Sequence, residues 1–225
     1  MLVKRVWCFF EQSGTFRDKF QELGIDSVDC DIQNEYGKTD FQIDLFQEIC
    51  KAYDNEESLF DEISSDDLIF AFFPCIRFTK QAELTFNQVS NQVRFKSDYD
   101  KISVAMQLER ERYDLFILFS KMVQVCLRKK LRLIIENPYS TNHYLVRYFP
   151  IKAKLVDMDR RDRGDFFQKP TQYWFINCEP SYNYDALFNM QVIQNNFKRV
   201  SDCQCRERSE ISSEYALQFI REFVL

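Results

Sequence analysis

The feature that most constrains the fold of this chain is the alternation of short apolar runs with segments of helical periodicity. Four apolar runs end in polar, Gly or Pro residues, and each has the length of a buried strand: residues 4–10, 28–31, 68–73 and 131–135. Segments of helix length separate these runs, which is typical of proteins whose parallel strands are joined by crossover helices. The sequence therefore predicts an α/β fold with a mostly parallel central sheet flanked by helices.

The intervening segments carry apolar residues on one helical face. Phe16, Phe20 and Leu23 share such a face, and Gly24 is a stop signal for that helix. We expect helices over residues 15–23, 44–53, 99–129 and 210–224, the last of which closes the fold. Weaker patterns at residues 153–156 and 172–177 predict an antiparallel pair of strands at one edge of the sheet. Residues 85–98 lack strong periodicity and are expected to form a mobile loop.

The length of the chain favours one domain, and its charge limits how it meets nucleic acid. A chain of 225 residues can form one full core but is cramped for two, so a single domain over residues 1–225 is expected. The net charge of -5 argues against binding nucleic acid by bulk electrostatics, so any such contact must be local. The basic candidates are residues 128–132 and 160–163.

The eight cysteines are scattered through strand-like and helix-like runs. This distribution favours reduced thiols in a cytoplasmic protein over a disulfide framework. His143 is the single histidine, so no metal site is predicted, and a structural role is expected for it. The sequence shows neither the pattern of a signal peptide nor an apolar run of membrane-spanning length, and we expect no membrane association.

Polar residues follow the predicted strands at their carboxyl ends, where open α/β sheets bind ligands. After the first run, Ser13 and Gly14 form a turn into a helix whose first amides could approach a ligand closely. Asp29 and Asp31 end the second run, and Asp44 precedes the next helix. Acids at such positions either hold ribose hydroxyls or cap helices, and the sequence leaves both roles open.

Two further strand ends carry groups suited to chemistry on a pyrimidine ring. Pro74 terminates the third run and leaves Cys75 in a loop over the edge of the sheet. Glu136 emerges from the fourth run toward the same crevice, and Asn137 and Pro138 would fix its turn. A carboxyl group there can donate to N3 of cytosine and accept from its exocyclic amine, which makes C6 electrophilic toward a thiolate. The alternative roles are a buried structural cysteine and a strand-terminal ion pair.

The order of these elements resembles the DNA cytosine-5 methyltransferases, and most closely their small, often phage-borne branch. Only the Pro-Cys and Glu-Asn-Pro elements are specific, although the similarity spans nearly the whole chain. The elements that carry it are Phe10-x-x-Ser13-Gly14-Thr15-Phe16, Ser27-Val28-Asp29-Cys30-Asp31, Asp44-Leu45, Phe73-Pro74-Cys75, Ile135-Glu136-Asn137-Pro138, Lys169-Pro170-Thr171 and Arg208-Ser209-Glu210-Ile211.

The resemblance implies a Rossmann-like methyltransferase fold, S-adenosylmethionine as cofactor, and a role in DNA modification of the restriction-modification type. It implies Cys75 as nucleophile, Glu136 as the residue that activates the base, and Arg161 or Arg163 as a contact to a cytosine flipped out of its stack. Ribose would lie near Asp29 or Asp31 and adenine near Asp44. The whole implied cofactor set is Phe10, Ser13, Gly14, Thr15, Asp29, Asp31, Asp44 and Pro74.

Departures from the family pattern keep two alternatives open. Gln12 stands where glycine is common, and Ile76 follows Cys75 where Gln or Thr is usual, which suits a binding protein or subunit that has lost turnover. Residues 177–208, where target recognition is expected, are short and carry few basic groups. Either a partner subunit or homo-oligomer supplies the recognition of DNA, or the substrate is RNA or a free nucleotide.

Overall fold

A seven-stranded sheet forms the centre of the computed structural model, which describes residues 3–87, 93–183 and 210–225. The strand order is β3-β2-β1-β4-β5-β7-β6. The strands are β1 (Arg5–Phe9), β2 (Asp26–Asp31), β3 (Phe41–Gln42), β4 (Leu68–Phe72), β5 (Arg132–Pro138), β6 (Leu155–Asp157) and β7 (Thr171–Ile176). Neighbours from β3 to β5 pair in parallel, whereas β7 runs antiparallel to both β5 and β6. The predicted mostly parallel sheet and the antiparallel edge pair are both confirmed.

The helices follow the predicted segments closely, with one correction. They are α1 (Thr15–Glu22), α2 (Leu45–Asp54), α3 (Lys80–Phe86), α4 (Asp98–Lys129), α5 (Tyr144–Tyr148) and α8 (Ser213–Phe219), with short turns η1 (Leu59–Asp61), η2 (Arg160–Arg163) and the π-helical η4 (Ile220–Val224). The loop prediction for residues 85–98 is wrong at both ends, because α3 extends to Phe86 and α4 begins at Asp98. Residues 88–92 lie outside the described part of the chain.

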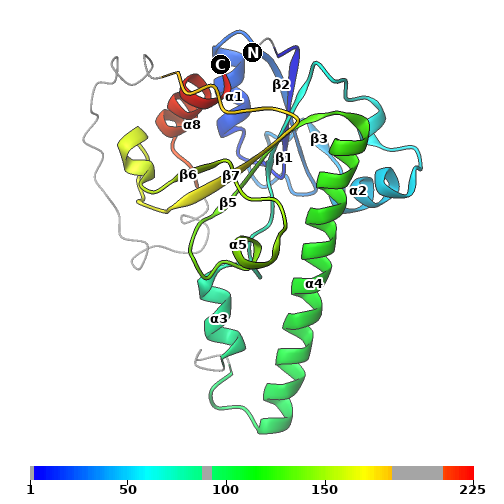
Figure 1. Cartoon of the computed structure of the whole chain (residues 1–225), viewed down its shortest axis with the longest axis vertical. Coiled ribbons are helices and arrows are strands. Elements are labelled where there is room, and N and C mark those ends of the chain that lie inside the picture. Colours follow the sequence, from blue (N-terminus) through cyan, green and yellow to red (C-terminus); the bar gives the residue numbers. More distant parts are fainter. Residues whose placement is uncertain (1–2, 88–92, 184–209) are drawn as a thin grey trace.

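Two apolar layers sandwich the sheet because successive strand residues point to opposite faces. Trp7 and Phe9 belong to the layer covered by α2, α4 and α5, whereas Val6 and Cys8 belong to the layer covered by α1 and α8 (Figure 1). Phenylalanine fills both layers, and the rings of Phe70 and Phe219 stack with their centroids 5.7 Å apart. Helices on both faces of the sheet leave the carboxyl ends of its central strands as the place for a ligand.

Helix α4 is longer than its packing against the sheet requires. Its 32 residues span ~48 Å, yet the first of its buried residues is Leu108. Figure 1 shows the amino-terminal part of α4 running beside α3, well beyond the sheet. The amino-terminal end of α4 therefore presents side chains that no layer of the core covers.

Several predictions concern features that the described residues address only in part. The expected recognition region at residues 177–208 is described only to Asn183, and Cys203 and Cys205 lie outside the described residues. Within residues 3–87, 93–183 and 210–225, no helix is both long enough and apolar enough to cross a membrane. The same part of the chain holds no cluster of three or more His, Cys, Asp or Glu side chains arranged to hold a metal ion.

Candidate functional site

A cavity of about 270 Å³ lies at the carboxyl ends of β1, β4 and β5. This place is where the strand order reverses direction, because β1 lies between β2 and β4, and open α/β sheets bind ligands at such a point. The lining combines aromatic rings with a thiol, carboxylates, hydroxyls and one ammonium group: Phe10, Glu11, Gln12, Ser13, Thr15, Tyr36, Phe72, Phe73, Pro74, Cys75, Glu136, Pro138, Lys169, Glu210 and Ile211. The predicted residues Phe10, Ser13, Thr15, Pro74, Cys75 and Glu136 are thus brought together.

Glu136 is the most exceptional member of this lining. Its neighbours across the sheet are Phe72 on β4 and Tyr173 on β7, so its backbone is fixed on both sides. The residue is only 7% exposed, and its Oε1 has no hydrogen-bond partner among the described residues. A buried acceptor without a donor is costly, which marks this oxygen as a place for a ligand N–H or O–H.

Asn137 ties the ends of β4 and β5 together. Its Nδ2 donates to the carbonyl of Phe73 at 2.8 Å and to that of Glu136 at 3.0 Å. These bonds hold the end of β5 against the residue that precedes Pro74 and Cys75. The predicted role of Asn137 in fixing this turn agrees with the geometry.

Cys75 is half-buried in the loop that follows β4, and its carbonyl accepts from the amide of Phe78 at 2.9 Å. Burial raises the pKa of its thiol, and the carboxylate of Glu136 acts in the same direction, whereas the ammonium of Lys169 lowers it. In the protein alone, therefore, the thiol form is favoured. Attack on a ring requires that a cation or a substrate group compensate the buried negative charge.

Lys169 was not predicted as a site residue, although it stands in the Lys169-Pro170-Thr171 element of the resemblance. It is half-buried just before β7 and has a left-handed backbone conformation with φ of 21°. Burial lowers the pKa of its ammonium group, as does Arg160, while Glu136 and Cys75 raise it. No periodicity in the sequence points to Lys169, because β7 reaches the cavity only by pairing antiparallel with β5.

The turn after β1 is closed by an acid rather than left open for a phosphate. Glu11 is 6% exposed and accepts from the amides of Phe16 at 2.7 Å and Arg17 at 3.2 Å, the first free amides of α1. Burial raises the pKa of Glu11 to about 7, although these backbone donors act in the opposite direction. Ser13 and Thr15 share a hydrogen bond of 2.9 Å at the cavity wall.

Gly14 shapes this turn from outside the cavity lining. Its φ of 70° is a left-handed conformation, and an added Cβ would lie 2.6 Å from Nη2 of Arg17. The glycine thus leaves room for a buried guanidinium, which the sequence motif did not reveal.

Asp29 belongs to a network beside the cavity and not to its lining. Its carboxylate is fully buried, accepts from Nη1 of Arg17 at 3.1 Å and from the amide of Asp40 at 2.7 Å. Arg17 also pairs with Asp18 at 2.7 Å and with Asp40 at 3.2 Å. Every charge of this network has a partner, so Asp29 is held by the protein itself.

The two other predicted acids occupy local turns. Asp31 is partly exposed at the end of β2 and accepts from the amide of Gln33 at 2.7 Å. Asp44 is the N-cap of α2, with its Oδ1 accepting from the amides of Phe46 at 3.0 Å and Gln47 at 3.3 Å. Neither lines the cavity. The capping role that the sequence left open for Asp44 is therefore the one it performs.

Arg161 and Arg163 do not reach the cavity. Arg161 donates to Asp159 at 2.8 Å, and Arg163 donates to Glu222 at 2.7 Å and pairs with Asp157 at 3.2 Å. Their neighbour Arg160 is fully buried in an ion pair with Asp165. Because η2 turns these side chains toward other acids, the cation that the structure brings to Cys75 and Glu136 is Lys169.

His143 has the structural position that was expected for it. It is 1% exposed, its Nδ1 lies 3.4 Å from Nε2 of Gln172, and burial lowers its pKa to about 4.

No model of a protein family matches this chain, and neither does any curated protein. The function must therefore be argued from the cavity.

Proposed function

We propose that this chain is an S-adenosylmethionine-dependent methyltransferase that acts on C5 of cytosine in DNA through a transient adduct at Cys75. The observation that carries the proposal is the meeting of Cys75 and Glu136 in one cavity, where Oε1 of Glu136 has no hydrogen-bond partner among the described residues. The amidine edge of cytosine supplies the donor that this oxygen lacks. Lys169, in the same lining, supplies the positive charge that favours the thiolate.

The residues around the cavity suit a cationic nucleoside without phosphates better than a dinucleotide. Amides in the first turn of a helix bind phosphate in dinucleotide-binding folds, but in α1 the amides of Phe16 and Arg17 already donate to Glu11. The further acid Glu210 in the lining and the rings of Phe10 and Phe73 favour a positively charged ligand with an aromatic base. S-adenosylmethionine fits that description, and when bound it supplies an electrophilic methyl group on a sulfonium.

The chain's own residues would then act in a fixed order. The Cys75 sulfur adds to C6 while Glu136 hydrogen-bonds N3 and the exocyclic amine, so that the electron pair of the C5–C6 bond moves toward C5. C5 would then accept the methyl group, with the neutral thioether of the cofactor as the leaving group. Loss of the C5 proton to a base then expels the Cys75 thiolate and restores the aromatic ring. Cys75 is regenerated, and C5 carries the methyl group in place of its proton, which the base has taken.

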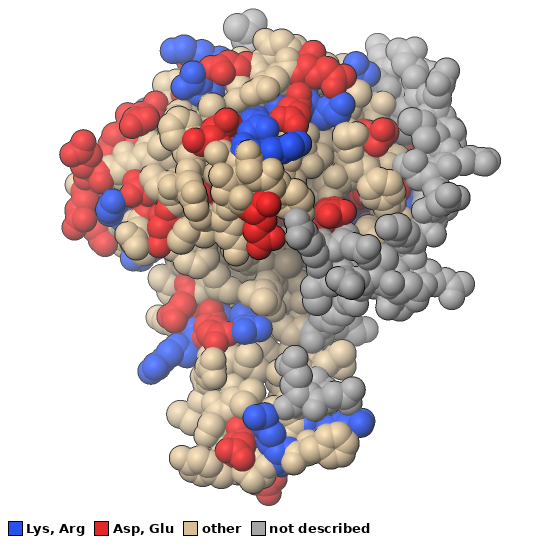
Figure 2. Space-filling model, turned by 180° about the vertical axis from the view of Figure 1, so that it is seen from behind, with Lys and Arg blue, Asp and Glu red and all other residues tan. Residues whose placement is uncertain are grey.

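A free nucleotide or RNA is the second candidate substrate, and one observation favours it. On the face that Figure 2 draws, Lys and Arg alternate with Asp and Glu in place of a broad basic surface. Duplex binding depends on clustered cations, and so a smaller substrate requires less of this surface. The chemistry at Cys75 and Glu136 is the same for either substrate.

Covalent trapping tests the proposal directly. The protein is incubated with S-adenosylmethionine and oligonucleotides that contain 5-fluorocytosine, whose C5 fluorine cannot leave as a proton does, and the adduct is located by peptide mass spectrometry. We expect an adduct on Cys75 that is absent from Cys75→Ser. The matched control is Cys50→Ser, which removes a partly exposed thiol on α2 that lies outside this cavity.

Calorimetry of S-adenosylmethionine binding separates the alternatives. Binding without an adduct on DNA, RNA or free nucleotide substrates would leave a nucleoside-binding protein that has lost turnover. Binding of neither cofactor nor substrate would reject the methyltransferase assignment.

A further inference from the structure

The exposed end of α4 carries an apolar stripe that the proposed reaction does not use. Tyr99, Ile102, Met106 and Tyr113 are 81%, 60%, 70% and 63% exposed, respectively. Their spacing of three, four and seven residues places them on one side of the helix, opposite the buried Leu108 and Leu118. In Figure 2 the projecting end of the molecule is mostly uncharged. Large apolar side chains left in water cost free energy, which favours a partner that covers this stripe.

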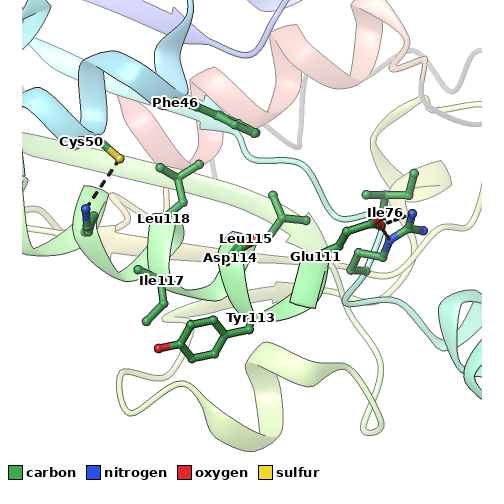
Figure 3. A pocket seen from close by; sticks show the side chains of 11 residues that line it. Phe46, Cys50, Ile76, Glu111, Tyr113, Asp114, Leu115, Ile117 and Leu118 are labelled. Carbon is green, nitrogen blue, oxygen red and sulfur yellow. Dashed lines mark hydrogen bonds and ion pairs between the residues drawn. The ribbon is translucent and has the colours of Figure 1, made fainter. Parts of the chain in front are cut away.

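The stripe leads into a cavity that opens between α2 and α4. It holds about 570 Å³ and is lined by Tyr113 from the stripe and by Ile117, about one helical turn beyond it, together with Leu115, Leu118, Phe46 and Ile76 (Figure 3). Lys121 lies at one end, 3.7 Å from the thiol of Cys50 and 4.8 Å from the centre of the Tyr53 ring. No carboxylate of the described residues forms an ion pair with Lys121. The lining also includes Asp114 and the ion pair of Arg77 with Glu111, so the cavity is mostly apolar and Lys121 is the cation in it that no described carboxylate pairs with.

The spacing along α4 makes stripe and pocket complementary to each other. Tyr99 and Ile117 each lie nine residues from Leu108, which is about 13.5 Å of helix in opposite directions. An antiparallel copy of α4 with its two-fold axis near Leu108 therefore brings Tyr99 level with the pocket. Asp98, whose side chain is 96% exposed, then lies within about one turn of Lys121.

We propose that two copies of this chain associate through antiparallel α4 helices, with Tyr99 of each copy entering the α2–α4 pocket of the other. A two-fold pair uses the same patch on both copies, so each aromatic anchor and each Asp98 to Lys121 contact occurs twice. The stripe lies among acids as well as bases, with Asp98, Asp100 and Glu109 beside Lys101 and Arg110, which disfavours nucleic acid as the occupant. One helix pair is a small interface, so a dissociation constant of roughly 10 μM is expected.

Sedimentation of the full chain between 1 and 100 μM tests the pairing. We expect a concentration-dependent dimer, and Tyr99→Asp or Ile102→Asp should raise its dissociation constant at least about tenfold because each change buries two charges. Met158→Asp is the matched control, since Met158 is 58% exposed and follows β6 at the far edge of the sheet. It should leave the dimer intact. A wild-type chain that stays monomeric at 100 μM, or a dimer that resists Tyr99→Asp, would overturn the proposal.

A charge exchange tests the antiparallel register itself. Lys121→Glu should weaken the dimer by facing Asp98 of the other copy, and the double variant Lys121→Glu with Asp98→Lys should restore it. Failure to restore the dimer rejects this register. The measurement requires no cofactor or substrate, so its result does not depend on whether the methyltransferase proposal is correct.

Discussion

Two groups of polar side chains flank the turn after β1, each around a buried carboxylate, and they differ in how many of their hydrogen-bonding atoms have partners. In the network of Arg17, Asp29 and Asp40, each charged group pairs with another at 3.1 to 3.2 Å. In the cavity beside it, Cys75, Glu136 and Lys169 converge while Oε1 of Glu136 has no partner among the described residues. A closed network stabilises a fold, whereas an open one is available for a ligand. The contrast favours the cavity over the Asp29 network as the place for a ligand.

The largest expected effect is in the cavity, where Oε1 of Glu136 has no partner among the described residues. Glu136→Gln keeps the volume of the side chain but cannot offer a carboxyl group to N3 of cytosine. We expect formation of the 5-fluorocytosine adduct to slow by about 10²- to 10⁴-fold. The free energy of unfolding in urea should change by less than about 1 kcal/mol, because no internal partner of Oε1 is lost. An unfolding loss as large as that of the Asp29 variant below would make Glu136 a structural residue.

The next largest effect is expected in the network of Arg17, Asp29 and Asp40. Asp29→Ala removes a fully buried partner of Arg17 and should lower the unfolding free energy by about 2–4 kcal/mol, since Asp18 and Asp40 still pair with the guanidinium. Asp31→Ala, on the same strand but partly exposed, is the control and should cost less than about 1 kcal/mol. Equal losses for the two variants would show that the Arg17 network is not closed in solution.

Glu11 lies between the two groups, since it lines the cavity and accepts from the amide of Arg17, and it should make the stability of the protein depend on pH. Its pKa of about 7 in the folded protein lies above the ordinary 4.5, so the folded state holds the proton more tightly than the unfolded state does. The contribution of Glu11 to stability is therefore greatest below pH 4.5 and falls as pH rises toward 7. The unfolding free energy of the wild-type chain should therefore fall by about 2 kcal/mol more between pH 5 and pH 8 than that of Glu11→Gln, which has no carboxyl group to ionise. Urea unfolding at both pH values measures this difference. An unchanged pH profile would contradict the burial of an ionisable carboxyl group.

The smallest expected effect sharpens the role of Lys169. Lys169→Met removes the cation that lowers the pKa of Cys75, so the thiol pKa should rise. Alkylation of Cys75 by iodoacetamide at pH 8, followed by peptide mass spectrometry, should slow roughly three- to tenfold. Lys169→Arg should restore the rate, and Cys50 provides an internal reference in every sample. A rate that Lys169→Met leaves unchanged would remove Lys169 from the proposed mechanism.

The fold could be predicted from the sequence because its signals are local. Short apolar runs, helical periodicity and breakers such as Gly24 and Pro74 placed most strands and helices within a few residues. The two-residue β3 and helix α3 carry too little periodic signal to be recognised, since a strand of two residues has no alternation to read. Cys75 and Glu136 could be paired in advance because parallel neighbouring strands end at the same edge.

The other predicted residues show where local reasoning stops. Asp29 and Asp44 looked alike as acids at element ends, yet Arg17 encloses one and α2 places the other at its N-cap. The basic run at residues 160–163 offered three arginines, and η2 directs each of them to an acid. Which partner a charged side chain meets depends on elements far away in the chain, and spacing does not encode that.

The sequence by itself determined the α/β architecture, the meeting of Cys75 and Glu136 at neighbouring strand ends and the structural character of His143, because these follow from periodicity, chain breakers and composition. Only the tertiary structure decided that Lys169 lies in the same cavity as Cys75 and Glu136. It also decided that Glu11 accepts hydrogen bonds from amides in the first turn of α1, and that Tyr99 is exposed at the end of α4. The physical reason is that burial and pairing arise from residues distant in sequence: β7 reaches β5 across some thirty positions, and the cavity exists only once they pair.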